Sequence, residues 1–190
     1  RAVARKAIVG GIAMKKCLIV VDYQNDFTTG SLGCPQAKAL EHSLAARIAQ
    51  CRSEGWDIIF TLDTHRSDYL STQEGKNLPV EHCISGTEGH GLYGEVASAV
   101  RDGDRLFYKN TFGSDELYEY LKFNPYESIE LCGVVTNICV ISNAVLAKTA
   151  QPETPIYVNS SLTASNDDAL GQAALNVMKT LQINIVEEGK

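Results

Sequence analysis

The feature that most constrains the fold of this chain is a regular alternation between short apolar runs and longer segments with helical periodicity. The run CLIVVDY at 17–23 is apolar at almost every position, which is typical of a strand buried on both faces. The segment 37–55 spaces Leu40, Leu44 and Ile48 three or four residues apart, as one face of a helix does. Strands that alternate with helices favour right-handed crossovers, and therefore a parallel sheet covered by helices.

The alternation continues along the chain and predicts an α/β fold. We expect a three-layer α/β/α arrangement, Rossmann-like, around a six-stranded and mainly parallel sheet. The expected strands cover 17–23, 56–63, 104–109, 128–135, 155–159 and 183–188, and the expected helices cover 37–55, 94–101, 115–123, 137–150 and 166–181. Ser165 or Asn166 is expected to begin the last helix, with Asp167 and Asp168 in its first turn.

The length of 190 residues suits one domain of roughly 150 residues with a small appendage. Residues 14–190 are assigned to this single domain. The first 13 residues carry three cations ahead of a short apolar stretch that contains Gly10 and Gly11. We expect 1–13 to form an N-terminal extension outside the core.

Composition argues against two classes of partner. The 17 Lys and Arg against 23 Asp and Glu give a net charge of −6, which provides no basic surface for nucleic acid. The chain holds no run of about 18 apolar residues, so we expect no membrane span. The six cysteines form no CxxC pair, and Cys17, Cys51 and Cys132 lie in apolar or helical stretches as small core residues do. Free thiols suit a reducing compartment, so we expect a cytoplasmic protein.

Reactive side chains lie at the ends of several predicted strands. Asp22 ends the first strand, Asp63 and His65 follow the second, Lys109 ends the third and Cys139 follows the fourth. The carboxyl ends of parallel strands meet at one edge of a sheet, and ligands bind there. We therefore expect these side chains to converge.

Cys139 lies in GVVTNICV, where an apolar strand passes into a helix. A thiol in the first turn of a helix faces free backbone N–H groups and the positive end of the helix dipole, so we expect a lowered pKa and a thiolate. Asp22 can accept the thiol proton, and Lys109 can keep that acid ionised or stabilise developing charge. Each residue alone also has a structural interpretation, as a buried helix cysteine, an acid that caps a loop or a solvated lysine. Their convergence favours nucleophilic catalysis.

A second group of reactive residues belongs to the polar loop 64–92, which is long for a compact domain unless it has a function. Asp63 and His65 form an Asp-x-His pair, and Glu74 and His82 follow nine and a further eight residues later. These donors form a mixed N/O set that suits a borderline cation in a catalytic site with room for water. The alternative is a solvated loop with capping acids.

Four segments in this order resemble one protein family: VVDYQNDF (20–27), the DTH-to-EHCISG loop (62–86), FYKNTFGS (107–114) and GVVTNICV (133–140). They are similar to segments of the isochorismatase-like cysteine hydrolases and, within these, of the nicotinamidases. The resemblance extends from about Met14 to Glu188. It implies the isochorismatase-like hydrolase fold, a small-molecule amide substrate and a homo-oligomer, either a dimer or a tetramer.

The resemblance also implies catalytic roles. The positions that match the family's catalytic set are Asp22, Lys109 and Cys139. The Cys139 thiolate would attack an amide carbonyl, Asp22 would pass the proton to the leaving ammonia, and water would then hydrolyse the thioester. Backbone N–H groups of Val135 and Cys139, beside a cis peptide bond at Val134–Val135, would form the oxyanion hole.

A metal site follows from the same resemblance. One divalent ion, zinc first and iron or manganese next, would be held by Asp63, His65, Glu74 and His82. The ion would hold the pyridine nitrogen of nicotinamide and place its carboxamide over the nucleophile. The implied reaction cleaves a linear carboxamide C–N bond and gives nicotinate and ammonia, in NAD salvage.

Two positions depart from the nicotinamidase pattern. Phe27 matches one aromatic residue of the family's ring clamp, but Leu78 and Pro79 stand where the second is usual. The segment 110–114 also differs from the usual Tyr-Ser-Ala-Phe type, and we take Phe27 and Phe112 as the substrate contacts. Two alternatives stay open: a related hydrolase of another small amide (carbamoyl- or ureido-type) or of isochorismate, and a non-catalytic binding module.

Overall fold

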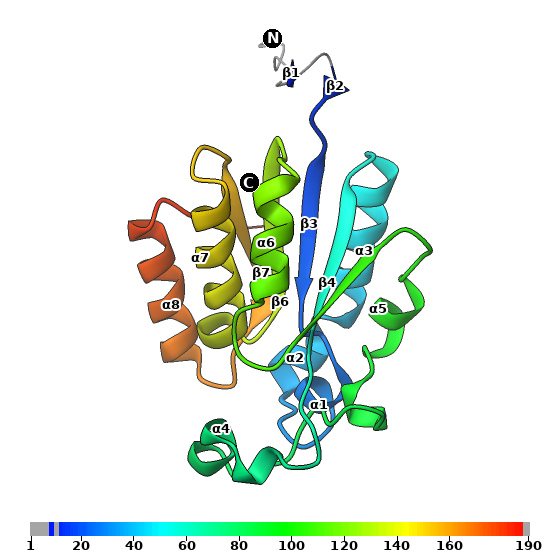
Figure 1. The fold of residues 1–190 in the computed structure, drawn as a ribbon, viewed down its shortest axis with the longest axis vertical. Helices are drawn as coiled ribbons and strands as arrows, with labels where there is room; N and C mark the ends of the chain where they lie inside the picture. Colours follow the sequence, from blue (N-terminus) through cyan, green and yellow to red (C-terminus); the bar gives the residue numbers. More distant parts are fainter. Residues whose placement is uncertain (1–7, 10–11, 188–190) are drawn as a thin grey trace.

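The computed structural model describes residues 8–9 and 12–187 (Figure 1). Its centre is a sheet of six parallel strands in the order β5-β4-β3-β6-β7-β8. The predicted α/β fold is therefore confirmed. The strands are β3 (Lys16–Val21), β4 (Asp57–Asp63), β5 (Arg105–Lys109), β6 (Ser128–Val134), β7 (Ile156–Ala164) and β8 (Asn184–Val186).

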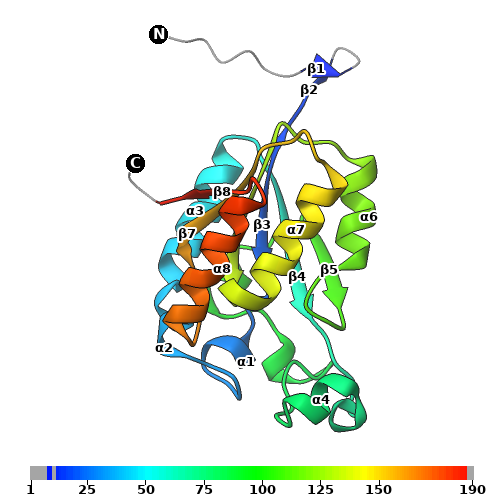
Figure 2. The same cartoon turned by 90° about the vertical axis from the view of Figure 1, so that its left-hand side faces the viewer.

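Helices cover both faces of this sheet, as the two views in Figures 1 and 2 show. Each face has its own hydrophobic cluster, so the molecule has the predicted three layers. Residues of α6 (Asp115–Phe123), α7 (Ile141–Ala150) and α8 (Asp168–Thr180) belong to one cluster, and residues of α2 (Pro35–Ala39), α3 (Glu41–Ser53) and α5 (Gly94–Ser98) belong to the other.

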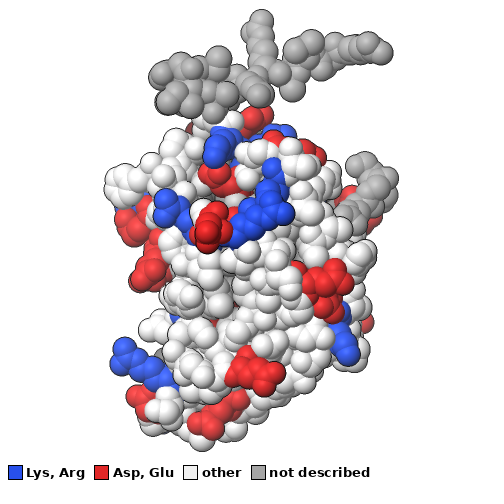
Figure 3. Space-filling view, turned by 90° about the vertical axis from the view of Figure 1, so that its right-hand side faces the viewer, with Lys and Arg blue, Asp and Glu red and all other residues white. Residues whose placement is uncertain are grey.

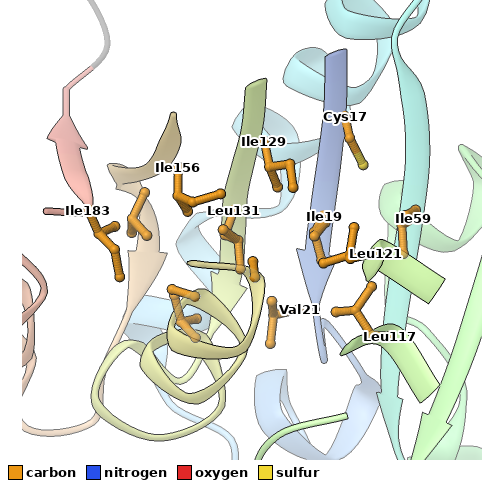
Figure 4. Close-up of a cluster of buried hydrophobic side chains, with 14 of the residues drawn as sticks. Cys17, Ile19, Val21, Ile59, Leu117, Leu121, Ile129, Leu131, Ile156 and Ile183 are labelled. Atoms are coloured by element: carbon orange, nitrogen blue, oxygen red, sulfur yellow. The ribbon is translucent and has the colours of Figure 1, made fainter. Parts of the chain in front are cut away.

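The central position of β3 in the sheet explains why its residues 17–21 are all apolar. Cys17, Ile19 and Val21 lie in the cluster that Figure 4 shows, together with side chains of α6. Leu18 and Val20 point to the opposite face and lie in the cluster that α3 covers. All five side chains are fully buried. Burial of each large aliphatic side chain contributes about 1.5–3 kcal/mol, so a slip of one residue in register would be costly.

The segment predicted as one helix over 37–55 forms two helices. α2 begins at Pro35, which suits the first helical turn because no N–H is needed there, and α3 begins after Leu40. The long polar loop also holds short elements stabilised by local hydrogen bonds. Thr72 Oγ1, for example, accepts a hydrogen bond from Gly75 N. The short elements not predicted from the sequence are α1 (Asn25–Thr28), η1 (Tyr69–Ser71), α4 (Gln73–Asn77) and η2 (Glu88–His90).

The C-terminal half differs from the prediction in three details. The helix expected over 137–150 starts with a π-helical turn, η3 (Thr136–Val140), before α7. Strand β7 continues past 159 to Ala164, because its pairing with β6 shifts register and resumes at Thr163. Asp167 caps α8 from outside by accepting a hydrogen bond from Leu170 N, so it does not lie in the first turn. The end of the strand predicted over 183–188 lies outside the described residues.

Ahead of the sheet, β1 (Ile8–Val9) and β2 (Ile12–Ala13) pair with each other in antiparallel fashion. The extension predicted for 1–13 falls mostly outside the described residues and stays a prediction. No helix within 12–187 is long and apolar enough to cross a membrane. On the face shown in Figure 3, acidic and basic side chains lie in small groups separated by uncharged surface, as the composition suggests. Cys17, Cys51 and Cys132 are fully buried free thiols, as predicted.

The segment GHGLYG at 89–94 has the G-x-G-x-x-G spacing of dinucleotide-binding loops. Its first two residues belong to the turn η2 and no strand ends directly before it, so the strand-to-helix context of a dinucleotide site is missing. The segment instead pairs with the residues that follow β3. Gly91 O accepts a hydrogen bond from Asn25 N at 2.9 Å, and Tyr93 N donates to Tyr23 O at 3.0 Å.

Candidate active site

The carboxyl ends of four adjacent strands bring the predicted residues together. Asp22 directly follows β3, Asp63 ends β4 and Lys109 ends β5, where Asp63 and Lys109 are register partners. His65 lies just beyond β4, and Cys139 lies in η3 after β6. All five residues are buried. The convergence expected at this edge of the sheet is confirmed.

The Lys109 ammonium connects the acids and the thiol. Its Nζ lies 2.6 Å from Asp22 Oδ2, 3.2 Å from Asp63 Oδ1 and 3.5 Å from Cys139 Sγ. Burial alone would lower the pKa of Lys109, but the two carboxylates and the thiol outweigh burial and raise it. Lys109 is therefore a buried, fixed cation, and the interpretation as a solvated lysine is wrong.

Asp22 has a left-handed backbone, with φ +46°. Its N–H donates to Thr61 O at 3.1 Å, and its side-chain Oδ1 accepts a hydrogen bond from Thr61 Oγ1 at 2.6 Å. Oδ2 faces Lys109 without an aligned hydrogen bond from any described residue. Burial raises the pKa of the Asp22 carboxyl, and the charge of Lys109 opposes this rise. A carboxylate with a raised pKa is better matched to accepting a proton near neutral pH.

The Cys139 thiol differs from its predicted state. Sequence reasoning predicted a lowered pKa, but burial and the Asp22 carboxylate raise the pKa of the thiol well above its usual value. The prediction was wrong because the helix-start argument omitted both effects. Cys139 therefore rests as a thiol, and it needs a base to become a nucleophile.

Asn143 holds the turn that contains Cys139. Its Nδ2 donates to Cys139 O at 2.8 Å and to Phe112 O at 3.1 Å, and its Oδ1 accepts from Ser114 N at 3.0 Å. Asn143 is fully buried. One amide thus links the thiol-bearing turn to the segment that follows Lys109.

The chain ahead of this turn is shaped by Gly133 and a cis peptide bond. Gly133 has φ +106°, and a Cβ there would collide with Val21 O, so only glycine fits. The Val134–Val135 peptide bond is cis, as the resemblance implied. Val135 and Cys139, the predicted oxyanion donors, line the same pocket.

The four residues predicted as metal ligands lie together beside Lys109. Asp63 Oδ2 is 2.9 Å from His65 Nε2 and 3.3 Å from His82 Nε2. Glu74 Oε1 is 3.8 Å from both imidazole nitrogens. Ligands at about 2.0–2.1 Å from a tetrahedral zinc ion are about 3.3 Å apart, so this spacing fits a single small cation. The interpretation of this region as a solvated loop is wrong, because Asp63, His65 and His82 are buried.

The charge states of these residues also suit a cation. Burial would raise the pKa of Asp63, but contacts with His65 and His82 and the charge of Lys109 hold it well below its usual range. His82 Nδ1 lies 2.8 Å from Val80 O, and because a carbonyl can only accept, this nitrogen carries the proton. Nε2 of His82 faces Asp63 Oδ2 at 3.3 Å, and it is the nitrogen that would ligate a cation in the neutral imidazole.

Sequence reasoning missed two residues that hold the cluster in place. Gln24 Oε1 accepts from Asp63 N at 2.7 Å, and its Nε2 donates to Asp63 O at 2.8 Å. Asp26 Oδ2 accepts from Cys83 N at 2.7 Å, directly after His82. Both residues belong to the segment VVDYQNDF. The signal in the sequence was an amide and an acid placed two residues apart, directly after a predicted strand.

A pocket of about 200 Å³ opens over Cys139 and is also lined by three of the four predicted metal ligands, Asp63, Glu74 and His82. Its volume is below the roughly 300–1,000 Å³ of sites for drug-sized ligands, so it fits a small molecule. Phe27, Leu78 and Phe112 line its walls, together with Leu32, Cys34, Ala37, Val134, Val135, Ile138, Ala164 and Asn166. No lysine or arginine is among the lining residues. A more open polar hollow of about 830 Å³ is lined by His65, Glu74 and Lys109 among others, but not by Cys139.

Comparison with known proteins agrees with this geometry. The family model described as "Isochorismatase domain" matches residues 16–187. The chain is 27% identical to the nicotinamidase/pyrazinamidase of Mycobacterium tuberculosis, over 90% of this chain and 98% of that protein.

Two solved structures have the same fold. The pyrazinamidase/nicotinamidase of Streptococcus mutans has a TM-score of 0.81 at 28% identity and covers 90% of this chain and 100% of its own. The pyrazinamidase of Pyrococcus horikoshii, in complex with zinc, has a TM-score of 0.80 at 24% identity, covering 91% and 99%. The family model spans the whole six-stranded sheet, and the chain therefore belongs to the isochorismatase family of hydrolases.

Proposed function

We propose that this protein is a metal-containing cysteine amidohydrolase that converts nicotinamide and water into nicotinate and ammonia. The observation that carries the proposal is the position of Lys109 Nζ, within 3.5 Å of Asp22 Oδ2, Asp63 Oδ1 and Cys139 Sγ. The proposed base Asp22, the proposed nucleophile Cys139 and the proposed metal ligand Asp63 all lie around the buried Lys109 ammonium, beside a small pocket. This arrangement supports acyl transfer from a small substrate.

In the first half of the proposed reaction, Asp22 takes the proton from the Cys139 thiol. The thiolate attacks the amide carbonyl carbon, and backbone N–H groups of Val135 and Cys139 stabilise the oxyanion. Asp22 returns the proton to the amide nitrogen as the C–N bond breaks. Ammonia leaves, and the acyl group stays on Cys139 as a thioester.

In the second half, Asp22 takes a proton from a water molecule that attacks the thioester carbonyl. The C–S bond breaks, Asp22 passes its proton to the departing sulfur so that the thiol of Cys139 is restored, and the carboxylic acid product releases its own proton to solvent. Lys109 stays charged throughout, since its pKa is raised, and it keeps Asp22 ionised between proton transfers.

Asp63, His65, Glu74 and His82 would hold the metal ion. Zinc is the first candidate because two imidazoles with carboxylate oxygens form a borderline N/O donor set, and iron and manganese are the next. The solved pyrazinamidase of Pyrococcus horikoshii is a zinc complex, which supports the same choice. When bound, the ion would supply a Lewis-acid site for the ring nitrogen of the substrate.

The pocket lining favours a neutral substrate. It holds Asp63 and Glu74 but neither lysine nor arginine, so no cationic side chain of the lining faces the two carboxylates of isochorismate. A neutral carboxamide needs no such partner, and this difference favours amide hydrolysis over isochorismate hydrolysis.

A second candidate is an amidase for a small non-aromatic amide, of the carbamoyl or ureido type. Leu78 lines the pocket where an aromatic residue would complete a clamp on a planar ring. An aliphatic wall accepts flat and non-flat groups alike, so the reaction class has stronger support than the choice of nicotinamide.

The deciding experiment measures ammonia release by the metal-loaded protein from nicotinamide, benzamide and an N-carbamoyl amino acid. Nicotinamide is expected to react fastest, because benzamide lacks the ring nitrogen. The Cys139→Ala variant is the control and should release none. If nicotinamide releases no ammonia but another of the three amides does, the second candidate is favoured. If none of the three substrates releases ammonia, the proposed reaction class is contradicted.

A further inference from the structure

Thr61 is an unusual residue for its position. It lies in the middle of strand β4, whose sequence is DIIFTLD, and it is fully buried. Its neighbours along the strand, Phe60 and Leu62, are apolar, and its register partners are Val21 and Phe107. A valine would pack equally well in such a strand, so the hydroxyl group calls for an explanation.

The hydroxyl is used by the carboxylate of Asp22. Thr61 Oγ1 donates to Asp22 Oδ1 at 2.6 Å, whereas Lys109 Nζ lies 2.6 Å from the other oxygen, Oδ2. The charged and titratable groups that face Asp22 are Lys109, Asp63 and Cys139. They come from β5, β4 and η3, and among them Lys109 Nζ approaches Oδ2.

The two oxygens of Asp22 are therefore in different environments. Oδ1 is occupied by the Thr61 hydroxyl, whereas Oδ2 faces Lys109 and has an acceptor position free of aligned donors. A carboxylate rotates about its last side-chain torsion over a broad range, and the ion pair with Lys109 alone would allow either oxygen of Asp22 to face the ammonium. One short hydrogen bond removes this freedom.

We propose that Thr61 is a positioning residue that anchors Asp22 Oδ1 and so makes Oδ2 the oxygen that exchanges the proton with Cys139. The expected effect of Thr61 on turnover rests on the proposed function. The anchoring of Asp22 and its proton exchange with Cys139 do not, because they involve only residues of this chain. Thr61 does not line the pocket over Cys139, so it does not contact the substrate.

The first test measures the rate at which iodoacetamide alkylates Cys139 near neutral pH, with the labelled peptide identified by mass spectrometry. Thr61→Val keeps the shape and removes the hydroxyl, and we expect alkylation to slow about tenfold because thiolate formation depends on a well-placed base. Thr61→Ser restores the hydroxyl and should return the rate to within about twofold of the wild type. Thr149→Val, on the exposed side of α7, is the control and should change nothing.

A double-mutant cycle separates positioning from a general structural effect. If Thr61 acts through Asp22, then Thr61→Val slows alkylation in the wild type but adds no further loss in the Asp22→Asn background. Thr61→Ala provides a second variant without the hydroxyl should the valine perturb folding, which thermal unfolding reports. The proposal would be overturned if Thr61→Val and Thr61→Ala were alkylated at the wild-type rate. It would also be overturned if Thr61→Val slowed alkylation equally in the wild type and in the Asp22→Asn background.

Turnover of the preferred amide gives an independent readout. Thr61→Val is expected to lower kcat by about ten- to a hundredfold, with KM changed less than about twofold, because the pocket itself is intact. A rise in KM without loss of kcat would contradict positioning. If the wild type hydrolyses none of the amides, the proposed function fails, but the alkylation experiment still decides the role of Thr61.

Discussion

Lys109 and Asp22 form an ion pair of 2.6 Å in which the two side chains are 1% and 0% exposed. The same ammonium contacts Asp63, so two carboxylates share one buried cation. A divalent ion at the Asp63 cluster would balance the remaining negative charge. Asp22, the proposed base, and Asp63, a proposed metal ligand, are therefore electrostatically coupled through Lys109, and a substitution at one should alter the pKa of the other.

Removal of Lys109 should destabilise the fold as well as stop the chemistry. Lys109→Met leaves the Asp22 charge buried without its partner, and breaking such a pair is expected to lower the free energy of unfolding by about 3–5 kcal/mol. Urea denaturation measures this change. Lys122→Met is the matched control, because Lys122 pairs with Glu119 on the surface and its loss should cost less than about 1 kcal/mol. Equal effects of the two variants would contradict the account.

The activity of the enzyme should have an acid limb set by Asp22. The reaction needs the carboxylate, and burial raises the pKa of Asp22, so kcat/KM should fall on acidification through a value above the ordinary 3.8. The effect on stability has the opposite sign. Since the folded protein favours protonated Asp22, this contribution to stability is present below the unfolded pKa and is lost as pH rises through the folded pKa.

The predicted pH dependence of stability can be checked with Asp22→Asn, and that of activity with the wild type. Asp22→Asn removes the titration, so its stability relative to the wild type should increase as pH rises through this window. Urea denaturation at several pH values measures the difference, and the pH profile of kcat/KM locates the limb. A limb at or below the ordinary value would show that burial does not control Asp22.

Metal binding should depend on His82 and be visible without any substrate. Equilibrium dialysis with zinc is expected to give one bound ion per chain, and His82→Ala should lower the affinity by at least about tenfold. Zinc at about 100 times its Kd should also stabilise the wild type by about 2.7 kcal/mol, which thermal unfolding reports. His42→Ala, on the exposed face of α3, is the control. Unchanged binding in His82→Ala would refute the assignment.

Phe112 should contribute to substrate binding and little to stability. Its side chain is 45% exposed at the pocket wall, so Phe112→Ala is expected to raise KM about tenfold, the loss of roughly 1.4 kcal/mol of apolar contact. Phe123→Ala removes an aromatic ring that is 76% exposed and outside the pocket, and it should leave KM unchanged. The same KM in both variants would exclude Phe112 as a substrate contact.

The sequence predicted the sheet and the convergence of Asp22, Lys109 and Cys139 because both follow from periodicity and from the geometry of parallel strands. Strand β3 carries an apolar residue at almost every position, and such a run can only be central. The extension of β7 to Ala164 could not be predicted, since it depends on a register shift against β6 that leaves no local pattern.

The missed features depend on partners far along the chain. In the sequence alone, Thr61 is an ordinary strand residue and Gln24 an ordinary loop residue. Their roles emerge only when β3 and β4 lie side by side and each residue bonds a partner 39 positions away. The raised pKa of Cys139 has the same origin, because the helix-start argument is local whereas burial and Asp22 are not. Local chemistry thus located the site, and long-range contacts decided its protonation states.

Cys139 is proposed to form a thioester with the acyl group of a small amide. Rapid quenching of the metal-loaded protein with nicotinamide, followed by mass spectrometry, detects this intermediate. We expect a nicotinoyl group on the peptide that contains Cys139, formed in step with the first ammonia released and absent from Cys139→Ala. Ammonia release by Cys139→Ala at the wild-type rate, without any adduct, would exclude the thioester.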